Sequence, residues 1–159
     1  MELRLKEKRF TIRDSFTIED KKGKDRFEVI GEFIEATKKL HIKNMKGKEV
    51  AMIKEKLISF EPKYSLYVND KKIGELERDE ALFGDKYYIS DLDWKIKGDD
   101  DDYDYKIMDG WKKIATIRKK FIALSNTYIL DIEDEKQEIP VVAALLAILC
   151  MIEQEKEKK

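Results

Sequence analysis

The sequence predicts a single domain built as a closed, mainly antiparallel β-barrel that surrounds its own C-terminal helix. Apolar and polar residues alternate with a period of two over most of the chain, the last apolar segment has no polar face, and a stretch of about twenty residues occurs twice. Alternation is typical of half-buried strands, whereas a helix without a polar face has to be buried on every side. A sheet that closes around the helix satisfies both requirements.

Length and charge favour one globular unit. The chain has 159 residues, 42% of them charged, and 33 basic residues nearly balance 34 acidic ones for a formal net charge of -1. A nucleic-acid-binding protein shows a basic excess, and a disordered chain combines high net charge with low hydrophobicity, so we expect neither. Residues 1–159 are expected to form one domain, with a barrel over 1–134, a central helix over 138–153 and a polar tail over 154–159.

Short alternating runs predict about a dozen strands, separated by turns rich in Gly, Asp, Asn and Lys. Asp109-Gly110 is a strong β-hairpin signal. This regular spacing of short strands is typical of an all-β sandwich or barrel. The predicted strands cover residues 16–18, 27–29, 40–42, 50–58, 64–68, 73–76, 87–89, 94–96, 105–108, 114–124 and 128–132.

The end of the chain predicts a buried helix. Residues 141–152 are all apolar and rich in Ala and Leu, which favours helix over strand. Pro140 suits the first helical turn, and the acidic residues just before it suit the positive end of the helix dipole. As a helix, residues 139–152 would span roughly 20 Å, short of the ~30 Å hydrocarbon core of a bilayer. We therefore expect no transmembrane segment, although a membrane-inserted tail is the alternative.

An internal repeat divides the barrel into two pseudo-equivalent halves. Residues 51–60 align with residues 115–124, and the match continues without a gap to residue 134. In both copies simple alternation would turn a charged residue inward, namely Glu55 and Lys119. A buried unpaired charge is costly, so we expect a β-bulge or a position near the barrel rim at these two places.

Three stretches of the chain resemble the LURP-one-related family, which belongs to the tubby C-terminal-like superfamily together with the phospholipid scramblases. They are residues 6–22 (KEKRFTIRDSFTIEDKK), 47–67 (GKEVAMIKEKLISFEPKYSLY) and 115–132 (ATIRKKFIALSNTYILDI), and the closing apolar helix matches too. The resemblance covers nearly the whole chain. It implies a twelve-stranded antiparallel barrel threaded by the C-terminal helix, and it implies phosphoinositide binding through basic residues on the barrel surface, as in tubby domains.

Six basic residues are candidates for a lipid head-group site. Four of them occupy equivalent places in the two copies of the repeat and are expected to face outward, and two lie just upstream in the second copy. Clustered Lys and Arg attract anionic lipid, although an ordinary solvated surface is the alternative in a chain this rich in lysine. The six candidates are Lys54, Lys56, Arg118 and Lys120, with Lys112 and Lys113 upstream.

Other reactive residue types give little support for chemistry. His41 has no Ser or Cys partner nearby in the sequence, so we expect no catalytic role for it. Cys150 lies in the apolar helix, where a buried thiol is inert. As the single cysteine of the chain, it excludes an internal disulfide and suits a reducing cytoplasm.

The acidic run from Asp99 to Asp104 is the one candidate for metal binding. Asp100, Asp102 and Asp104 have the first spacings of a calcium loop, but the required Gly and the final Glu are absent. We therefore expect a solvated loop, with no metal and no cofactor.

These observations favour a non-enzymatic binding module that recognises anionic phospholipid at a cytoplasmic membrane surface. The first alternative is a scaffold that binds another protein. An enzyme is the least favoured class, because no nucleophile–base pair, Gly-rich phosphate loop or metal-ligand cluster is recognisable. The N-terminus lacks the apolar stretch of a secretory signal, which again favours the cytoplasm.

Overall fold

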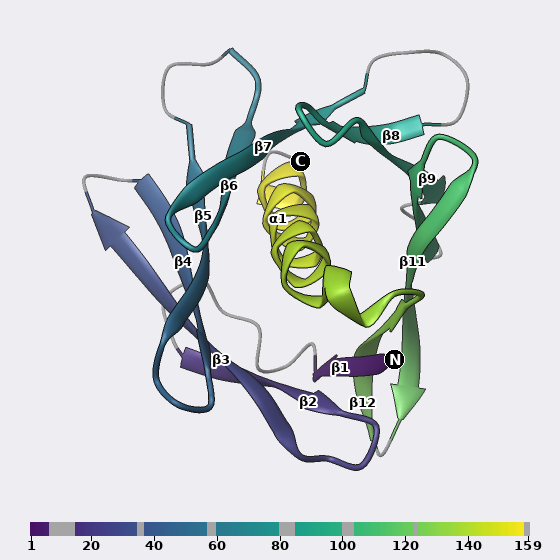
Figure 1. Cartoon of the computed structure of the whole chain (residues 1–159). Coiled ribbons are helices and arrows are strands. Elements are labelled where there is room, and N and C mark those ends of the chain that lie inside the picture. Colours follow the sequence, from purple (N-terminus) through teal and green to yellow (C-terminus); the bar gives the residue numbers. More distant parts are fainter. Residues whose placement is uncertain are drawn as a thin grey trace.

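In the computed structural model, which describes residues 1–6, 15–34, 37–56, 60–79, 85–99, 104–122 and 124–157, twelve antiparallel strands close into a barrel around one long helix (Figure 1). Each strand pairs with its neighbours in the sequence, and β1 pairs with β12 to complete the ring. The predicted closed barrel is confirmed. The strands are β1 (Glu2–Lys6), β2 (Ser15–Asp20), β3 (Asp25–Ile34), β4 (Thr37–Asn44), β5 (Glu49–Glu55), β6 (Lys63–Val68), β7 (Lys71–Arg78), β8 (Asp85–Ile89), β9 (Trp94–Asp99), β10 (Asp104–Asp109), β11 (Lys112–Ile122) and β12 (Ser125–Ile132).

The short strand β1, which was not among the predicted runs, closes the barrel. Its five residues pair with β12 on one side, and Leu3 and Arg4 pair with β2 on the other. The terminal ammonium of Met1 donates a hydrogen bond to the carbonyl of Ile132 at 3.1 Å. Without β1, the facing edges of β2 and β12 would expose unpaired backbone groups.

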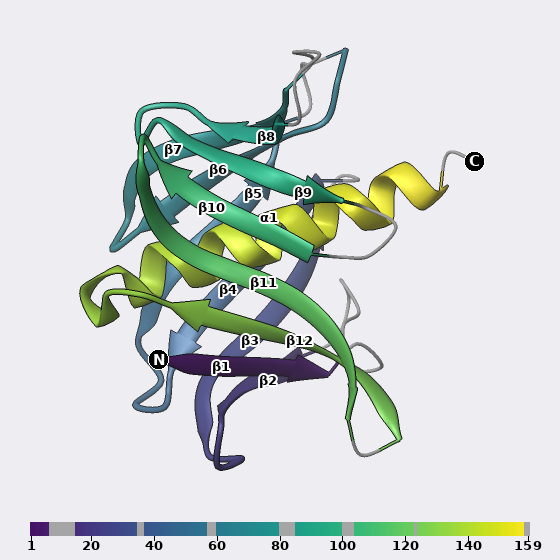
Figure 2. The ribbon, with the colours of Figure 1, turned by 90° about the vertical axis from the view of Figure 1, so that its right-hand side faces the viewer.

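The helix runs through the barrel from one open end to the other (Figure 2). A 3₁₀ turn, η2 (Glu135–Gln137), leads into α1 (Glu138–Glu157), and Asp134 caps the turn by accepting a hydrogen bond from the Lys136 N–H at 3.0 Å. Arg26 on β3 holds the start of the helix by donating to both carboxylate oxygens of Glu138, at 2.8 and 3.1 Å. The helix begins as predicted but continues beyond residue 153, because the Glu, Gln and Lys residues that follow are good helix formers.

The core lies between the helix and the inward faces of the strands. Every residue from 141 to 152 is buried, and so are the inward residues of the strands, among them Leu3, Ile18, Val29 and Leu66. The helix therefore has apolar neighbours on every side, as its composition requires. By length and composition alone Glu135–Glu155 could cross a membrane, as core helices of soluble proteins also could; 67% of its most apolar window is buried inside the barrel.

The pairing of strands confirms the internal repeat. In the first half Ile53 on β5 pairs with Leu66 on β6, and 64 positions later Ile117 on β11 pairs with Leu130 on β12. β11 is third and β5 ninth in the order of twelve strands around the barrel. Equivalent positions of the repeat consequently lie half a turn of the barrel apart.

Glu55 and Lys119 do point toward the barrel interior, and each lies beside a tyrosine. Glu55, 9% exposed, is the last residue of β5, and its Oε2 lies 3.3 Å from the hydroxyl of Tyr64. Lys119 lies over the Tyr128 ring, 5.8 Å from its centroid. The pairings of β5 with β6 and of β11 with β12 are regular here, so of the two predicted alternatives the position near the rim, without a β-bulge, is correct.

Candidate functional site

The structure does not bring the six predicted basic residues together. Lys54 lies on β5 with Lys56 just beyond its end, whereas Lys112, Lys113, Arg118 and Lys120 lie on β11. These strands are on opposite sides of the barrel (Figure 1). Residues at equivalent places in a two-fold repeat are separated by half a turn, so the six candidates form two separate sets. Their role in lipid binding stays a prediction. No single head group can contact both sets.

Three of the six candidates are also engaged in ion pairs. Lys56 Nζ lies 3.2 Å from Glu75 Oε1, Lys113 Nζ lies 3.2 Å from Glu133 Oε1, and Arg118 Nη2 lies 3.1 Å from Asp131 Oδ2. The Lys56 and Lys72 ammoniums beside Glu75 lower the pKa of that carboxyl against the opposing effect of partial burial. Exposed pairs of this kind are worth little energetically, so they leave the lysines available to an external anion.

A denser group of exposed lysines lies on β9 to β11. Alternation turns Lys95 and Lys97 of β9 outward together with Lys106 of β10, and all three are exposed. Lys112 and Lys113 begin β11 at the neighbouring hairpin. We call these five residues the lysine face. It includes two of the predicted candidates and three lysines that the sequence analysis did not single out.

Two lysines of this face oppose each other directly. In the antiparallel pairing of β9 with β10, Lys97 is the partner of Lys106. Side chains at directly opposite positions have their Cβ atoms about 5 Å apart, and like charges there destabilise a sheet. An anion placed between two such ammoniums offsets their repulsion.

A groove of about 660 Å³ runs beside the lysine face. Its lining joins charged, aromatic and thioether side chains. Among them is Trp111, which lies in the turn between β10 and β11 and is fully exposed. The Tyr88 hydroxyl donates a short hydrogen bond to Asp93, and that bond raises the pKa of Tyr88. The groove is lined by Tyr88, Asp93, Lys95, Lys97, Met108, Asp109, Gly110 and Trp111.

The other half of the barrel provides an internal comparison. His41 on β4 pairs with Met52, and Lys106 on β10 pairs with Thr116, 64 positions after Met52. His41 and Lys106 are therefore equivalent positions of the two halves.

The same comparison shows that the fold does not impose the lysine face. Opposite His41 lies Ile30, where the second half has Lys97 opposite Lys106. Two residues earlier on the same strands, the first half has Glu28 where the second half has Lys95. Lysines at these positions are therefore a property of the second half alone.

His41 and Cys150 are both held in unreactive arrangements. His41 Nε2 lies 2.6 Å from Glu32 Oε2 and its Nδ1 lies 2.6 Å from Glu49 Oε1, so both ring nitrogens are occupied by carboxylates from β3 and β5. Cys150 is buried in the helix, and burial raises the pKa of its thiol to about 12. At neutral pH this thiol is not a nucleophile.

Over the ranges described above, no three His, Cys, Asp or Glu side chains come together as metal ligands. The predicted acidic loop falls mostly on residues 100–103, which lie outside those ranges, so the expectation of a solvated loop stays a prediction.

The fold and the comparisons define the class of protein. The LURP-one-related family matches residues 1–152, and the chain belongs to that family. It is 28% identical over 152 residues to the uncharacterised protein YxjI of Bacillus subtilis (strain 168). The alignment covers 96% of this chain and 93% of YxjI.

A solved structure supports the same barrel. The X-ray structure of a protein from Arabidopsis thaliana superimposes with a TM-score of 0.63 at 15% identity, covering 96% of this chain and 90% of the other. At this level of identity the likeness concerns the fold alone. The predicted family and fold are therefore confirmed.

Proposed function

We propose that the protein is a non-enzymatic binding module that attaches to anionic phospholipid at a cytoplasmic membrane surface through the lysine face. The directly opposed pair Lys97 and Lys106 is the observation that carries the proposal, because its repulsion is relieved when an anion lies between the two ammoniums. Phosphate oxygens of lipid head groups meet this requirement. The likeness of the family to tubby domains supports the same choice of ligand.

The exposed side chain of Trp111 favours a membrane surface, rather than a soluble anion, as the ligand. Its indole is fully exposed beside Lys112 and lines the same groove as Lys95 and Lys97. Tryptophan is favoured at the membrane–water interface, where its ring lies at the level of the head groups. A basic surface with one exposed indole at its edge suits a flat lipid surface.

The expected affinity is modest. Lysines near an anionic surface contribute about 1 kcal/mol each, so five of them give at most about 5 kcal/mol, or a Kd of about 0.2 mM. Asp93 and Asp109 line the same groove and Glu133 pairs with Lys113, which lowers this further. We therefore expect reversible, salt-sensitive attachment, strengthened by polyvalent head groups such as phosphoinositides.

Co-sedimentation with vesicles tests the proposal. Vesicles of phosphatidylcholine alone are compared with vesicles that also contain phosphatidylserine or a phosphoinositide, at low and at physiological salt. The test variant is Lys95→Gln, Lys97→Gln and Lys106→Gln. The matched control is Lys39→Gln, Lys43→Gln and Lys54→Gln, which removes the same charge from exposed or half-buried lysines of the other half.

We expect anionic vesicles to bind the wild type and the control but not the test variant, with weaker binding as salt rises. Equal loss in both variants would mean that net charge, and not this face, attracts the membrane. Absence of wild-type binding to any vesicle would overturn the proposal and favour the second class, a scaffold for another protein.

A further inference from the structure

A second groove crosses the outer surface of β4, β5 and β6 in the half of the barrel that lacks the lysine face. It encloses about 240 Å³ and is lined by Lys39, Glu49, Ala51, Met52, Lys54, Tyr67 and Asp70. This groove is separate from the proposed lipid site, because none of the residues that line it belongs to the lysine face.

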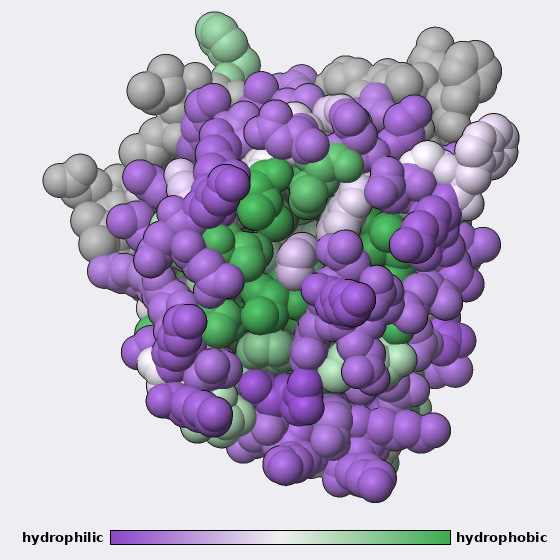
Figure 3. Space-filling view, viewed as in Figure 1, coloured by the Kyte–Doolittle hydropathy of each residue, from purple (hydrophilic) through white to green (hydrophobic). Residues whose placement is uncertain are grey.

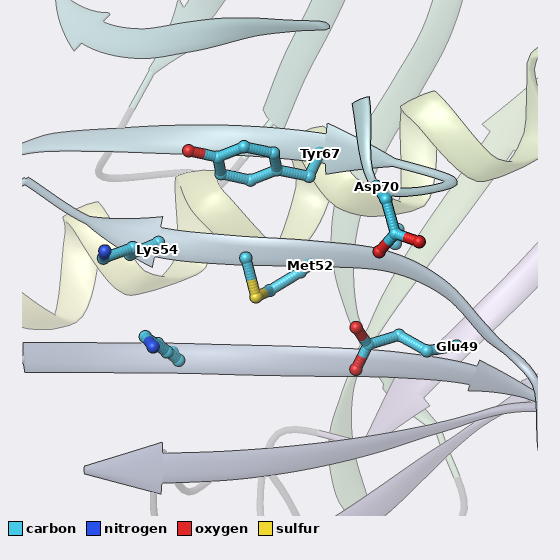
Figure 4. Close-up of a pocket in the computed structure, with 7 residues that line it drawn as sticks. Glu49, Met52, Lys54, Tyr67 and Asp70 are labelled. Atoms are coloured by element: carbon cyan, nitrogen blue, oxygen red, sulfur yellow. The ribbon is translucent and has the colours of Figure 1, made fainter. Parts of the chain in front are cut away.

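The two ends of this groove have opposite charge (Figure 4). At one end the carboxylates of Glu49 and Asp70 face each other, and at the other end lie Lys54 and the hydroxyl of Tyr67. Lys39 is directly opposite Lys54 in the pairing of β4 with β5, so this end holds two ammoniums. Met52 lies between the two ends.

The charged groups of the groove are largely unneutralised by the protein. In the described parts of the chain neither Lys39 nor Lys54 forms an ion pair, and Asp70 forms none either. Glu49 accepts from His41 Nδ1 through Oε1 at 2.6 Å, which fixes the carboxylate and leaves Oε2 for a ligand. The groove thus offers a pair of cations at one end and a pair of anions at the other.

The distance between the ends selects the length of a ligand. Lys39 and Lys43 lie on the same strand, and Lys43 is the partner of Glu49, so the two ends are four residues apart along β4. At about 3.3 Å per residue this is about 13 Å between backbone positions. A free amino acid or a phosphoethanolamine head group is too short to reach both ends, whereas an extended peptide of about three or four residues is long enough.

We propose that this groove binds a short unblocked peptide, with the N-terminal ammonium at Glu49 and Asp70 and the C-terminal carboxylate at Lys39 and Lys54. The peptide lies extended over Met52 and the Tyr67 ring. Methionine adapts its shape to different apolar groups, so the groove selects the two termini and the length more than the side chains. The ligand is a small zwitterion, which separates this site from the lipid-binding surface.

The test is a titration of the isotope-labelled protein followed by ¹H–¹⁵N NMR, with trialanine and tetra-alanine as probes. Matched probes carry an acetylated N-terminus, an amidated C-terminus or both. We expect shifts confined to amides of β4, β5 and β6 and of the turn that carries Asp70. Binding should be about five- to tenfold weaker when either terminus is blocked, as for the loss of one or two exposed ion pairs.

Two variants assign each end. Lys39→Gln with Lys54→Gln should abolish discrimination against the amidated probe but keep discrimination against the acetylated one, and Asp70→Asn should reduce only the second discrimination. Lys120→Gln, at an exposed position of β11 outside both sites, is the control and should change neither. Three results would overturn the proposal: shifts in other parts of the protein, equal affinity for the free peptide and its three blocked forms, or no shifts at all. The peptide titration does not test the lysine face, and the vesicle assay does not test this groove. Either proposal can therefore be contradicted while the other stands.

Discussion

Lys97 on β9 lies directly opposite Lys106 on β10, although the equivalent positions of the other half are occupied by Ile30 and His41. The barrel folds with either pair, so the opposed lysines are not needed for the architecture. Figure 3 shows the open end at which the helix begins, where apolar surface is framed by polar side chains.

Replacing one lysine of this pair should separate stability from function. Lys106→Glu converts like charges into an opposite pair, so we expect the free energy of unfolding to rise by about 0.5 kcal/mol. The same substitution should abolish binding to anionic vesicles. Urea denaturation measures the first effect and co-sedimentation the second.

The other half offers a matched control for this prediction. Lys54→Glu creates the same kind of opposite pair with Lys39. It should stabilise the fold by a similar amount and leave vesicle binding intact. A loss of stability in both variants would show that repulsion between the opposed lysines is negligible.

The enclosed helix should control the stability of the whole barrel. Leu146 is fully buried at its centre, so Leu146→Ala should lower the free energy of unfolding by about 2–5 kcal/mol through lost apolar contact and the cavity that remains. Leu124→Ala, at an exposed position, should change it by less than about 0.5 kcal/mol. Urea denaturation compares the two, and equal small effects would mean that the helix is not packed inside the barrel.

Cys150 should make stability depend on pH in the alkaline range. Burial raises the pKa of its thiol from 9.0 to about 12 in the folded protein. Between these values the unfolded state loses the proton first, so the contribution to stability is complete below pH 9.0 and declines as the pH rises toward 12.

The comparison of wild type with Cys150→Ala isolates this effect from the titration of lysines. Above about pH 9 the stability of the wild type relative to the variant should fall by about 1.4 kcal/mol per pH unit. In native protein at neutral pH, a thiol reagent should react only as fast as the protein unfolds. Rapid labelling of the native protein would contradict the burial of this side chain.

The fold could be predicted from the sequence because its main constraints are local. Alternation identified most strands, and the residues from Val141 to Ile152 required burial on all sides. The extent of the helix was harder to predict: Glu153 and the residues after it are polar but continue the helix to Glu157. β1 was missed since five residues without a bounding turn give a weak signal.

The site could be predicted only in part because it depends on pairing between strands. Aligning the repeat grouped Lys54 with Arg118, yet the same two-fold relation places them on opposite sides of the barrel. The pairing of Lys97 with Lys106 depends on the register across the β9–β10 connection. Nothing in the sequence fixes that register, although the alternating lysines at 95 and 97 were a visible signal.

The most direct test of the lysine face is the fluorescence of Trp111 on addition of phosphatidylserine-containing vesicles. Trp94, the other tryptophan, is buried and serves as an internal reference. We predict a blue shift and quenching by brominated lipid in the wild type, and neither in Trp111→Phe or in the Lys95, Lys97 and Lys106 triple variant. An unchanged emission from protein that co-sediments with these vesicles would show that another surface contacts the membrane and would contradict the account.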